Sequence, residues 1–317
     1  MRVAVVGAGA VGLGLSSCLL SGSDGSEVRI VARSHALRRE LDEHGLERRG
    51  IFGDVAHAPG TFELASSIGS LADDSFDFIL VCTKSTDAAA VASELASAWH
   101  EIAGPRRVVL CQNGWGIADA FVAKLPAELV YNARVITGFT RPSPASVEIT
   151  VHADAIRMGS LHGAAVEPLA PLARAIASGG IPCEVSWAIE RDLLAKLLYS
   201  CALNPLGALL DVPYGVLAER GTTRGIIDNV VSEIFAVLDR ARLHTHWEDP
   251  TSYLRDFYGE LLPATRTHES SMLHDVRAGR PSEIDALCGA VVELGARHGV
   301  PTPTNLALVD LLHAVDR

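Results

Sequence analysis

The sequence predicts an α/β protein in which a sheet-containing N-terminal domain is followed by an all-helical C-terminal domain. Two observations lead to this prediction. The chain opens on a strand, a glycine-rich turn, a helix and a second strand, and after about Trp187 no further strand pattern occurs. With 317 residues the chain is long enough for two domains of ordinary size. We place these domains at residues 1–187 and 188–317.

The opening unit is typical of a dinucleotide-binding site. Arg2 to Val6 is a short β-branched run, Leu13 to Leu20 continues as a helix, and Glu27 to Ala32 forms a second strand. Residues 7–12, G-A-G-A-V-G, stand between the first strand and the helix. A βαβ unit of about 30 residues is the context that this fingerprint requires. We therefore expect an N-terminal Rossmann-type dinucleotide-binding domain.

The glycines of this turn have separate predicted roles. Gly7 makes the tight turn, Gly9 lets the backbone approach a pyrophosphate, and Gly12 permits close packing of the helix on the strand. The pyrophosphate would meet the free N–H groups at the start of the helix. The cofactor-binding residues predicted here are Gly7, Gly9, Ala10, Val11 and Gly12.

The residues after the second strand indicate which dinucleotide is bound. An NAD site usually has Asp or Glu at this point for the ribose 2′-hydroxyl, whereas an NADP site has Arg for the 2′-phosphate. Here Arg33 is followed by Ser34, and both side chains suit a phosphate. Arg33 could instead be an ordinary surface residue. The prediction is NADPH.

Two further strands end in polar residues. Phe76 to Cys82 is followed by Lys84, and Val108 to Cys111 is followed by Asn113. Strand ends in such sheets face the ligand crevice, so both side chains are candidates to contact cofactor or substrate. A surface lysine and a plain Asn-Gly turn are the alternatives. Asp87 to His100 reads as a helix between them.

The remainder of the first domain mixes strands and a helix. Val130 to Thr137 is a strand, and Val147 to Val151 alternates as a half-exposed antiparallel strand. We expect Ala155 to Met158 to pair with the latter. Glu167 to Ser178 is helical.

An apolar run from Leu193 to Leu210 dominates the second half of the chain. Three polar side chains interrupt it, Lys196, Ser200 and Asn204, at positions i, i+4 and i+8. On a helix they lie on one face, spanning about 12 Å at roughly 1.5 Å per residue. Buried polar groups are costly without hydrogen-bond partners, so this stripe needs a polar partner. A bound substrate is one candidate.

Other interpretations of this run are open. A membrane helix has a similar length, but the lysine within the run and the Asn204-Pro205 pair argue against it. A structural ion pair would also account for a buried lysine. The chain has only three lysines, Lys84, Lys124 and Lys196, and every other basic side chain is Arg. Because Lys shifts its pKa readily when buried and Arg does not deprotonate, Lys196 suggests a transferable proton.

The rest of the second domain reads as helices. Ala218 to Leu243 is long and amphipathic, and Tyr253 to Arg277 is another helix with a break near Pro263. A third runs from Ser282 to His298, with Ser282 as N-cap and with Glu283 and Asp285 in its first turn. Gly299 ends it, and Pro303 to Val315 closes the chain.

Composition excludes several classes of function. A net charge of −11 argues against nucleic acid as a partner, so an anionic ligand needs a local basic or N–H-rich site. The six cysteines form no C-x-x-C pair and mostly sit in apolar runs, as buried free thiols do in a reducing compartment. Only Arg2 precedes the first apolar run, which argues against a secretion signal. We expect a cytoplasmic protein with no metal site and no membrane partner.

Nearly the whole chain resembles the ketopantoate reductase (2-dehydropantoate 2-reductase) family. The resemblance rests on G-A-G-A-V-G with Arg33, T-K-S at Lys84, Q-N-G at Asn113, A-K-L-L-Y-S-C-A-L-N-P-L around Lys196, and S-S-M-L-H-D-V-R-A-G-R-P-S-E-I-D from Ser270. It implies NADPH-dependent reduction of a 2-oxo acid, with 2-dehydropantoate giving pantoate in pantothenate and coenzyme A biosynthesis. It also implies that Lys196 is the proton donor and Glu283 its support.

The resemblance also implies a substrate site, with Asn113, Asn204 and Ser271 as binding residues. Two neighbours depart from the family pattern, because Ser200 and His268 stand where asparagines are usual. The predicted substrate-binding residues are Asn113, Lys196, Ser200, Asn204, His268 and Ser271. The two departures leave a different 2-oxo acid or carbonyl compound open as substrate. A non-catalytic NADP-binding sensor is less favoured, since it needs no proton donor, and the oligomeric state, including a homodimer, stays open.

Overall fold

The computed structural model describes residues 1–315 and shows two compact units. The first contains Met1–Gln112 and Ile117–Ile189, and the second contains the loop Asn113–Gly116 and the chain from Glu190 onward. The loop therefore belongs to the second unit, although it lies in the sequence between two parts of the first. A single boundary between residues 187 and 188 does not describe this division.

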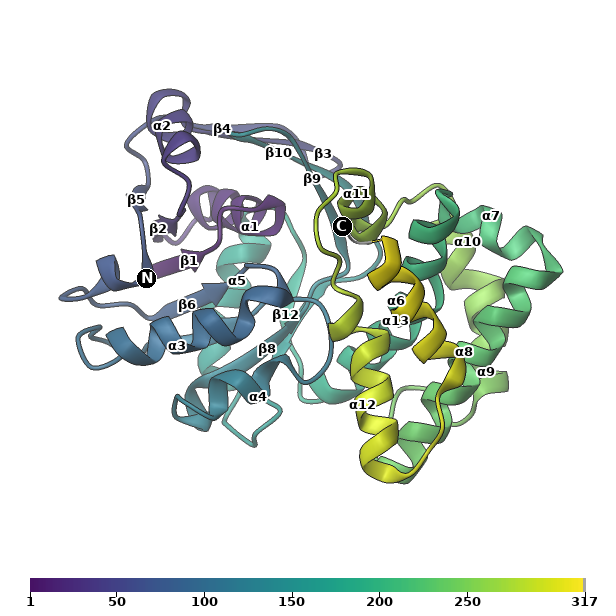
Figure 1. Cartoon of the computed structure of the whole chain (residues 1–317). Coiled ribbons are helices and arrows are strands. Elements are labelled where there is room, and N and C mark those ends of the chain that lie inside the picture. Colours follow the sequence, from purple (N-terminus) through teal and green to yellow (C-terminus); the bar gives the residue numbers. More distant parts are fainter. Residues whose placement is uncertain (316–317) are drawn as a thin grey trace. The chain divides into compact units, whose positions relative to one another are not determined.

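The first unit is built on an eight-stranded sheet of order β12-β11-β8-β7-β6-β1-β2-β5 (Figure 1). All neighbouring pairs are parallel except β11 with β8. This arrangement confirms the predicted α/β class. The strands are β1 (Arg2–Val6), β2 (Glu27–Val31), β5 (Glu63–Ala65), β6 (Phe78–Val81), β7 (Arg107–Leu110), β8 (Val130–Arg134), β11 (Ile156–Gly159) and β12 (Cys183–Val185).

Helices cover both faces of this sheet, with α1 and α5 on one and α3 and α4 on the other (Figure 1). Strand β1 shows the alternation, because Val3 and Val5 pack in the cluster of α1 while Ala4 and Val6 pack in that of α3. The helices of this unit are α1 (Ala10–Ser21), α2 (His35–His44), α3 (Ala88–Ala98), α4 (Ile117–Val122) and α5 (Ala170–Ser178). Short 3₁₀ turns lie at Ile68–Leu71, Ser85–Asp87, Ala127–Leu129 and Glu167–Leu169.

A second, four-stranded sheet of order β4-β3-β10-β9 completes the first unit. Its strands are β3 (Leu46–Gly50), β4 (Val55–His57), β9 (Thr137–Ser143) and β10 (Ser146–His152). The antiparallel pairing of β10 is as expected, but its partner is β9. The segment that includes Ala155–Met158 was predicted to pair with β10, which is wrong. As β11 it pairs with β8 and β12 in the main sheet, with Arg157 opposite Arg134.

The sequence did not indicate β3, because its residues L-E-R-R-G are mostly polar and lack the pattern of a buried strand. Arg48 of this strand is almost fully buried, and its Nη1 donates to the Gly179 carbonyl at 2.6 Å and to Cys18 Sγ at 3.0 Å. Tertiary partners thus allow a charged residue inside a strand. The predicted strand Val130 to Thr137 is in fact two, since the chain leaves the main sheet after Arg134 and enters the second at Thr137.

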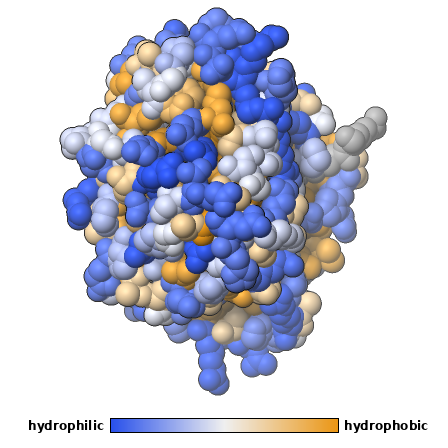
Figure 2. Space-filling model, turned by 90° about the vertical axis from the view of Figure 1, so that its left-hand side faces the viewer, coloured by the Kyte–Doolittle hydropathy of each residue, from blue (hydrophilic) through white to orange (hydrophobic). Residues whose placement is uncertain are grey.

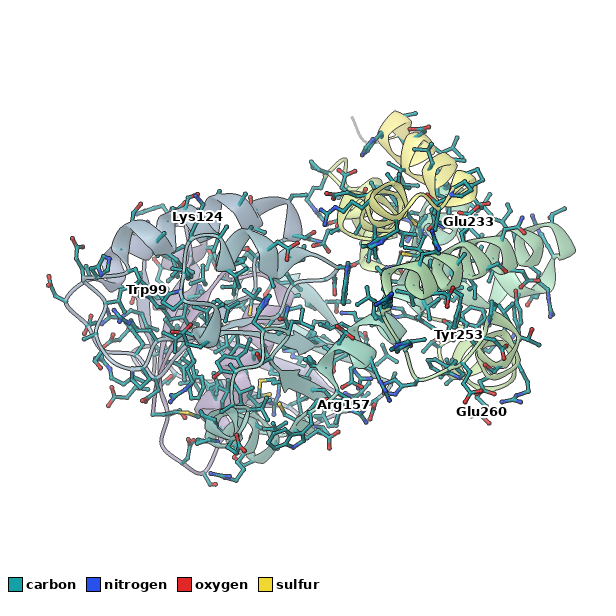
Figure 3. All side chains as sticks on the ribbon, turned by 90° about the horizontal axis from the view of Figure 1, so that it is seen from below. Trp99, Lys124, Arg157, Glu233, Tyr253 and Glu260 are labelled. Carbon is teal, nitrogen blue, oxygen red and sulfur yellow. The ribbon has the colours of Figure 1, made fainter. Side chains whose placement is uncertain are left out.

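The second unit is helical, and through residue 315 no strand follows β12. Its core gathers around α6, and Tyr253 lies fully buried in it (Figure 3). Glu233 of α8 accepts from the N–H groups of Thr304 and Asn305 at the start of α13. The elements are α6 (Ile189–Leu210), α7 (Tyr214–Glu219), α8 (Gly221–Ala241), α9 (Pro250–Asp256), a π turn (Phe257–Leu261), α10 (Leu262–Ala264), α11 (Ser271–Arg277), a 3₁₀ turn (Ile284–Ala286), α12 (Cys288–His298) and α13 (Pro303–Val315).

Two of the three helix predictions need correction. The helix expected at Ala218–Leu243 is α8, with a separate α7 before it. The break expected near Pro263 is confirmed, because the helical segment from Pro250 ends at Ala264 and the next helix begins at Ser271. The predicted N-cap Ser282 starts no helix, since α12 begins at Cys288 and Glu283 precedes a 3₁₀ turn.

Helix α6 is long and apolar enough to cross a membrane, the only such helix within residues 1–315. However, 67% of its most apolar window is buried inside the protein, as in the core helix of a globular fold. On the face shown in Figure 2, hydrophilic residues predominate and hydrophobic ones form small patches between them.

Candidate active site

The polar stripe of α6 is present as predicted. Lys196, Ser200 and Asn204 all lie within this one helix, at successive turns of one face. Around them the helix is packed in the core of the second unit by Leu194, Leu197, Leu198, Cys201, Ala202 and Leu203. Ser200 is buried, whereas Lys196 and Asn204 are partly exposed. The stripe therefore presents polar groups from an otherwise apolar helix.

Asn113 connects Lys196 to Glu283. Lys196 Nζ donates to Asn113 Oδ1 at 2.5 Å, and Asn113 Nδ2 donates to Glu283 Oε2 at 3.2 Å. Glu283 is 6% exposed. The amide thus accepts from the ammonium group and donates to the carboxylate, so one side chain orients both charged groups. An ammonium and a buried carboxylate linked in this way suit proton donation.

The loop that carries Asn113 is tightly fitted to the segment after Glu283. The Trp115 N–H donates to the Ala286 carbonyl at 2.9 Å. Gly114 has a φ of +113°, and a Cβ at this position would lie 2.5 Å from the same carbonyl oxygen. Only glycine fits such a conformation and such an approach. The Asn-Gly pair of the sequence is therefore a turn that also positions the side chain of Asn113 between Lys196 and Glu283.

Asn204 has a partner of its own. The Tyr214 hydroxyl donates to Asn204 Oδ1 at 2.6 Å, and burial raises the pKa of Tyr214, which keeps this hydroxyl protonated. The His268 ring packs edge-on against the Tyr214 ring, with 5.2 Å between the centroids. Burial, reinforced by His274, lowers the pKa of His268 despite the opposing charge of Glu269. His268 is then neutral at pH 7 and contacts Asn204's partner.

The two adjacent serines at the start of α11 have different roles. Ser270 is buried and caps the helix, because its Oγ accepts from the Leu273 N–H at 3.0 Å. Ser271 is the first helical residue and is exposed. The predicted substrate residue is therefore the serine whose hydroxyl is accessible.

Sequence reasoning missed three residues near this site. Asp192 lies one turn before Lys196 on α6, is fully buried, and is 2.9 Å from His246 Nε2. Its spacing to Lys196 is i, i+4, which places two side chains on one helix face and could have been noticed. Tyr214 and His246 had no local signal, because only packing brings them to α6.

The glycine-rich turn of the first unit fits a dinucleotide pyrophosphate. Gly7 has a φ of +107°, and a Cβ on Gly12 would lie 1.9 Å from the Gly7 carbonyl oxygen. A Cβ on Gly9 would meet nothing within 4 Å, so the backbone there borders open space. Helix α1 begins at Ala10, and the N–H groups of its first turn have no partner within the helix. Such N–H groups bind phosphate oxygens.

Arg33 stands just beyond β2, whose Val31 carbonyl accepts from the Gly7 N–H at 3.1 Å. Its guanidinium forms an ion pair with Glu94 of α3, with 2.6 Å between Nη2 and Oε1. Ser34 Oγ accepts from the Leu37 N–H and so caps α2.

Lys84 follows β6 and is exposed, and its carbonyl accepts from the Gln112 amide at 2.9 Å. Gln112, which the sequence did not single out, also donates to the Thr83 hydroxyl at 3.1 Å. The amide thus ties together the ends of β6 and β7. Lys84 is presented at the same sheet edge as the glycine-rich turn.

Comparison with known proteins agrees with these features. Residues 3–163 match the family described as ketopantoate reductase PanE/ApbA, and residues 188–316 match its C-terminal domain. The 2-dehydropantoate 2-reductase of Aquifex aeolicus is 33% identical, over 99% of this chain and 96% of its own.

Two solved structures are similar along the whole chain. A PanE/ApbA family ketopantoate reductase from Ralstonia eutropha has a TM-score of 0.82 at 28% identity, covering 100% of this chain and 98% of its own. D-mandelate dehydrogenase, solved with NADH and anilino(oxo)acetate, has a TM-score of 0.85 and the same coverage. At 24% identity it supports the fold alone.

The fold, the lysine site and these matches define an oxidoreductase that acts on a CH–OH/C=O pair. More specifically, the chain belongs to the ketopantoate reductase (2-dehydropantoate 2-reductase) family.

Proposed function

We propose that this enzyme uses NADPH to reduce a 2-oxo acid, namely 2-dehydropantoate, to pantoate in pantothenate and coenzyme A biosynthesis. The observation that carries the proposal is the hydrogen-bonded chain from Lys196 through Asn113 to Glu283. The full-length relative from Aquifex aeolicus, a 2-dehydropantoate 2-reductase, supports the substrate. The proposal includes a cytoplasmic location and a small-molecule substrate, with no nucleic-acid or membrane partner.

Lys196 acts as the general acid in this proposal. Bound NADPH would supply the hydride for C2 of the 2-oxo acid, and the former carbonyl oxygen would then carry negative charge. The Lys196 ammonium stabilises this charge and then donates its proton. Such general-acid catalysis contributes roughly 10²- to 10⁴-fold. Glu283, linked through Asn113, favours the charged form of Lys196 because a carboxylate near an ammonium stabilises it.

The other polar residues of the second unit hold the substrate. Because Asn204 Oδ1 accepts from Tyr214, Asn204 offers its amide N–H groups to the substrate's carboxylate or hydroxyl oxygens. Ser271 offers an exposed hydroxyl, and Ser200 lies one turn after Lys196. Asn113 orients Lys196 and is near enough to contact the same substrate.

The first unit holds the cofactor. The backbone N–H groups at Gly9, Ala10 and Val11 bind the pyrophosphate, and Arg33 binds the 2′-phosphate that distinguishes NADPH. Lys84, at the end of the neighbouring strand β6, contributes a second positive charge.

A second candidate is reduction of a different 2-oxo acid. Ser200 has a shorter reach than the asparagine usual there, and His268 packs against the tyrosine that orients Asn204. Tyr199 adds a further ring, 5.9 Å from that of Tyr214. These aromatic neighbours favour a bulkier or more apolar side chain on the substrate than that of 2-dehydropantoate.

The test is a steady-state assay of NADPH oxidation with 2-dehydropantoate and with a panel of straight-chain, branched and aryl 2-oxo acids. The main proposal expects the highest kcat/KM for 2-dehydropantoate. A higher kcat/KM for an aryl or larger aliphatic 2-oxo acid supports the second candidate. Absence of turnover with every 2-oxo acid would overturn both.

A further inference from the structure

The side chain that holds Arg33 is an acid from a different element. Glu94 lies on the solvent side of α3, whose Val91, Ala92 and Leu95 are buried against the sheet. Its carboxylate is 2.6 Å from Arg33 Nη2, and the two side chains are 42% and 54% exposed. The local sequence after β2 does not predict this acidic partner, because 61 residues separate Glu94 from Arg33.

The neighbouring polar groups are engaged with the backbone instead. Arg38 Nη1 donates to the carbonyls of Ala32 and Arg33 at 2.5 and 2.8 Å, and Ser34 caps α2. The end of β2 therefore carries two guanidinium groups and one carboxylate. This is where a doubly wound fold meets the ribose 2′-position of a dinucleotide.

A 2′-phosphate and the Glu94 carboxylate require the same donors on Arg33. A bound 2′-phosphate must displace Glu94 and then stays close to its negative charge. A 2′-hydroxyl has no charge, so it meets no such repulsion and can donate to the carboxylate. Glu94 thus lowers the affinity for NADPH, which carries the 2′-phosphate, and does not lower the affinity for NADH, which carries the 2′-hydroxyl.

We infer that Glu94 is a specificity-determining residue for the cofactor: by holding Arg33 it weakens the preference for NADPH over NADH. This inference rests on the proposed use of NADPH. It concerns the ratio of the affinities for NADPH and NADH, which the Glu94 carboxylate on α3 lowers.

The experiment measures binding of two fragments by calorimetry, adenosine 2′,5′-bisphosphate and 5′-AMP, which differ only in the 2′-phosphate. Glu94→Gln should bind the bisphosphate about two- to fivefold more tightly than wild type, the factor that an exposed ion pair provides. Its affinity for 5′-AMP should not rise. In about 1 M salt, where the Debye length is about 3 Å, the gain should shrink towards none.

Glu101→Gln is the matched control, because Glu101 is an exposed acid of the same unit and its loss changes the net charge equally. It should leave both affinities unchanged. In the Arg33→Ala background, Glu94→Gln should have a much smaller effect. An undiminished effect there, or an equal effect of Glu101→Gln, would overturn the inference.

The two proposals can fail separately. Equal binding of the two fragments by wild type, with no loss in Arg33→Ala, contradicts the proposed use of NADPH. A clear wild-type preference for the bisphosphate that depends on Arg33 but not on Glu94 contradicts the inference alone.

Discussion

Lys196 shows how the polar stripe of an otherwise apolar helix finds hydrogen-bond partners in this protein. Polar residues on an apolar helix require hydrogen-bond partners, and the protein itself provides some of these partners. Asn113 accepts from Lys196, and Tyr214 donates to Asn204. In the proposed function the substrate also contacts Lys196 and Asn204. Residue-level changes should therefore separate catalysis from binding.

Lys196→Ala should lower kcat by roughly 10²- to 10⁴-fold, the usual size of a general-acid contribution. Lys196→Arg should restore little of it, because a guanidinium keeps the charge but does not release its proton. The measurement is kcat per folded molecule, with the melting temperature determined in parallel. Lys124→Ala, at an exposed lysine of the first unit (Figure 3), is the control and should have no effect. Near-normal turnover by folded Lys196→Ala would refute the assignment.

Tyr214→Phe should raise KM for the 2-oxo acid more than it lowers kcat. The change removes the donor that orients the Asn204 amide, while Lys196 and Asn113 keep their contact. The increase should be about 2- to 12-fold, matching a hydrogen bond worth about 0.5–1.5 kcal/mol. Tyr131→Phe, whose hydroxyl donates to the Ala165 carbonyl in the other unit, serves as control. An unchanged KM would mean that Tyr214 does not position Asn204.

Stability should fall as the pH is lowered below about 6.5. Burial is the main cause that lowers the pKa of His57, His152 and His268 from the ordinary value of 6.5. The folded state then binds fewer protons than the unfolded state between the lowered pKa and 6.5, so stability rises with pH in that window. His268→Asn should flatten this dependence between pH 7.5 and 5.5 in denaturant unfolding. An unchanged slope would show that His268 titrates normally.

At the scale of elements, the loop Asn113–Gly116 is the smallest piece that organises the site. One backbone hydrogen bond and one side-chain amide hold this loop against the segment before α12, within the second unit. Gly114 approaches the Ala286 carbonyl so closely that no larger residue fits without displacement. The position of Asn113 therefore depends on a glycine beside it.

Gly114→Ala should reduce kcat and lower the melting temperature together. The new methyl group meets the Ala286 carbonyl, and a non-glycine residue at positive φ adds about 1–3 kcal/mol of strain. The loop then shifts and Asn113 loses its place between Lys196 and Glu283. Gly69→Ala, at a glycine with ordinary φ and nothing closer than 3.8 Å, should be nearly silent. Thermal unfolding and single-turnover kinetics measure the two effects.

At the scale of the whole molecule, the work is divided between the two units. The predicted cofactor residues up to Lys84 belong to the first unit, and the proposed proton donor Lys196 with its partners belongs to the second. Arg33→Ala should raise the Kd for NADPH at least about tenfold and leave that for NADH nearly unchanged, since a charge-assisted phosphate contact is worth about 1.5–3 kcal/mol.

Combining Arg33→Ala with Lys196→Ala should give additive losses in kcat/KM, within about 0.5 kcal/mol. The partner described for Arg33 is Glu94, and that for Lys196 is Asn113, so the two sites share neither. Strong non-additivity would show that the two residues act as one unit.

The sequence by itself determined the features that local pattern controls. The glycine-rich turn between β1 and α1 follows from fixed spacing, because each glycine answers a local backbone or packing demand. The stripe of Lys196, Ser200 and Asn204 follows from the helical repeat within one long apolar helix. The fold class followed because strand patterns stop before α6.

Only the tertiary structure decided which polar groups meet. Asn113 lies 83 residues from Lys196 and 170 from Glu283, and no periodicity relates such positions. Arg48 lies in a strand that the local sequence does not predict, because the Gly179 carbonyl and Cys18 accept hydrogen bonds from its guanidinium group. Arg33 meets an acid on α3 rather than one beside it in sequence. Long-range packing selects the partners of buried and charged groups, and a local pattern does not encode that selection.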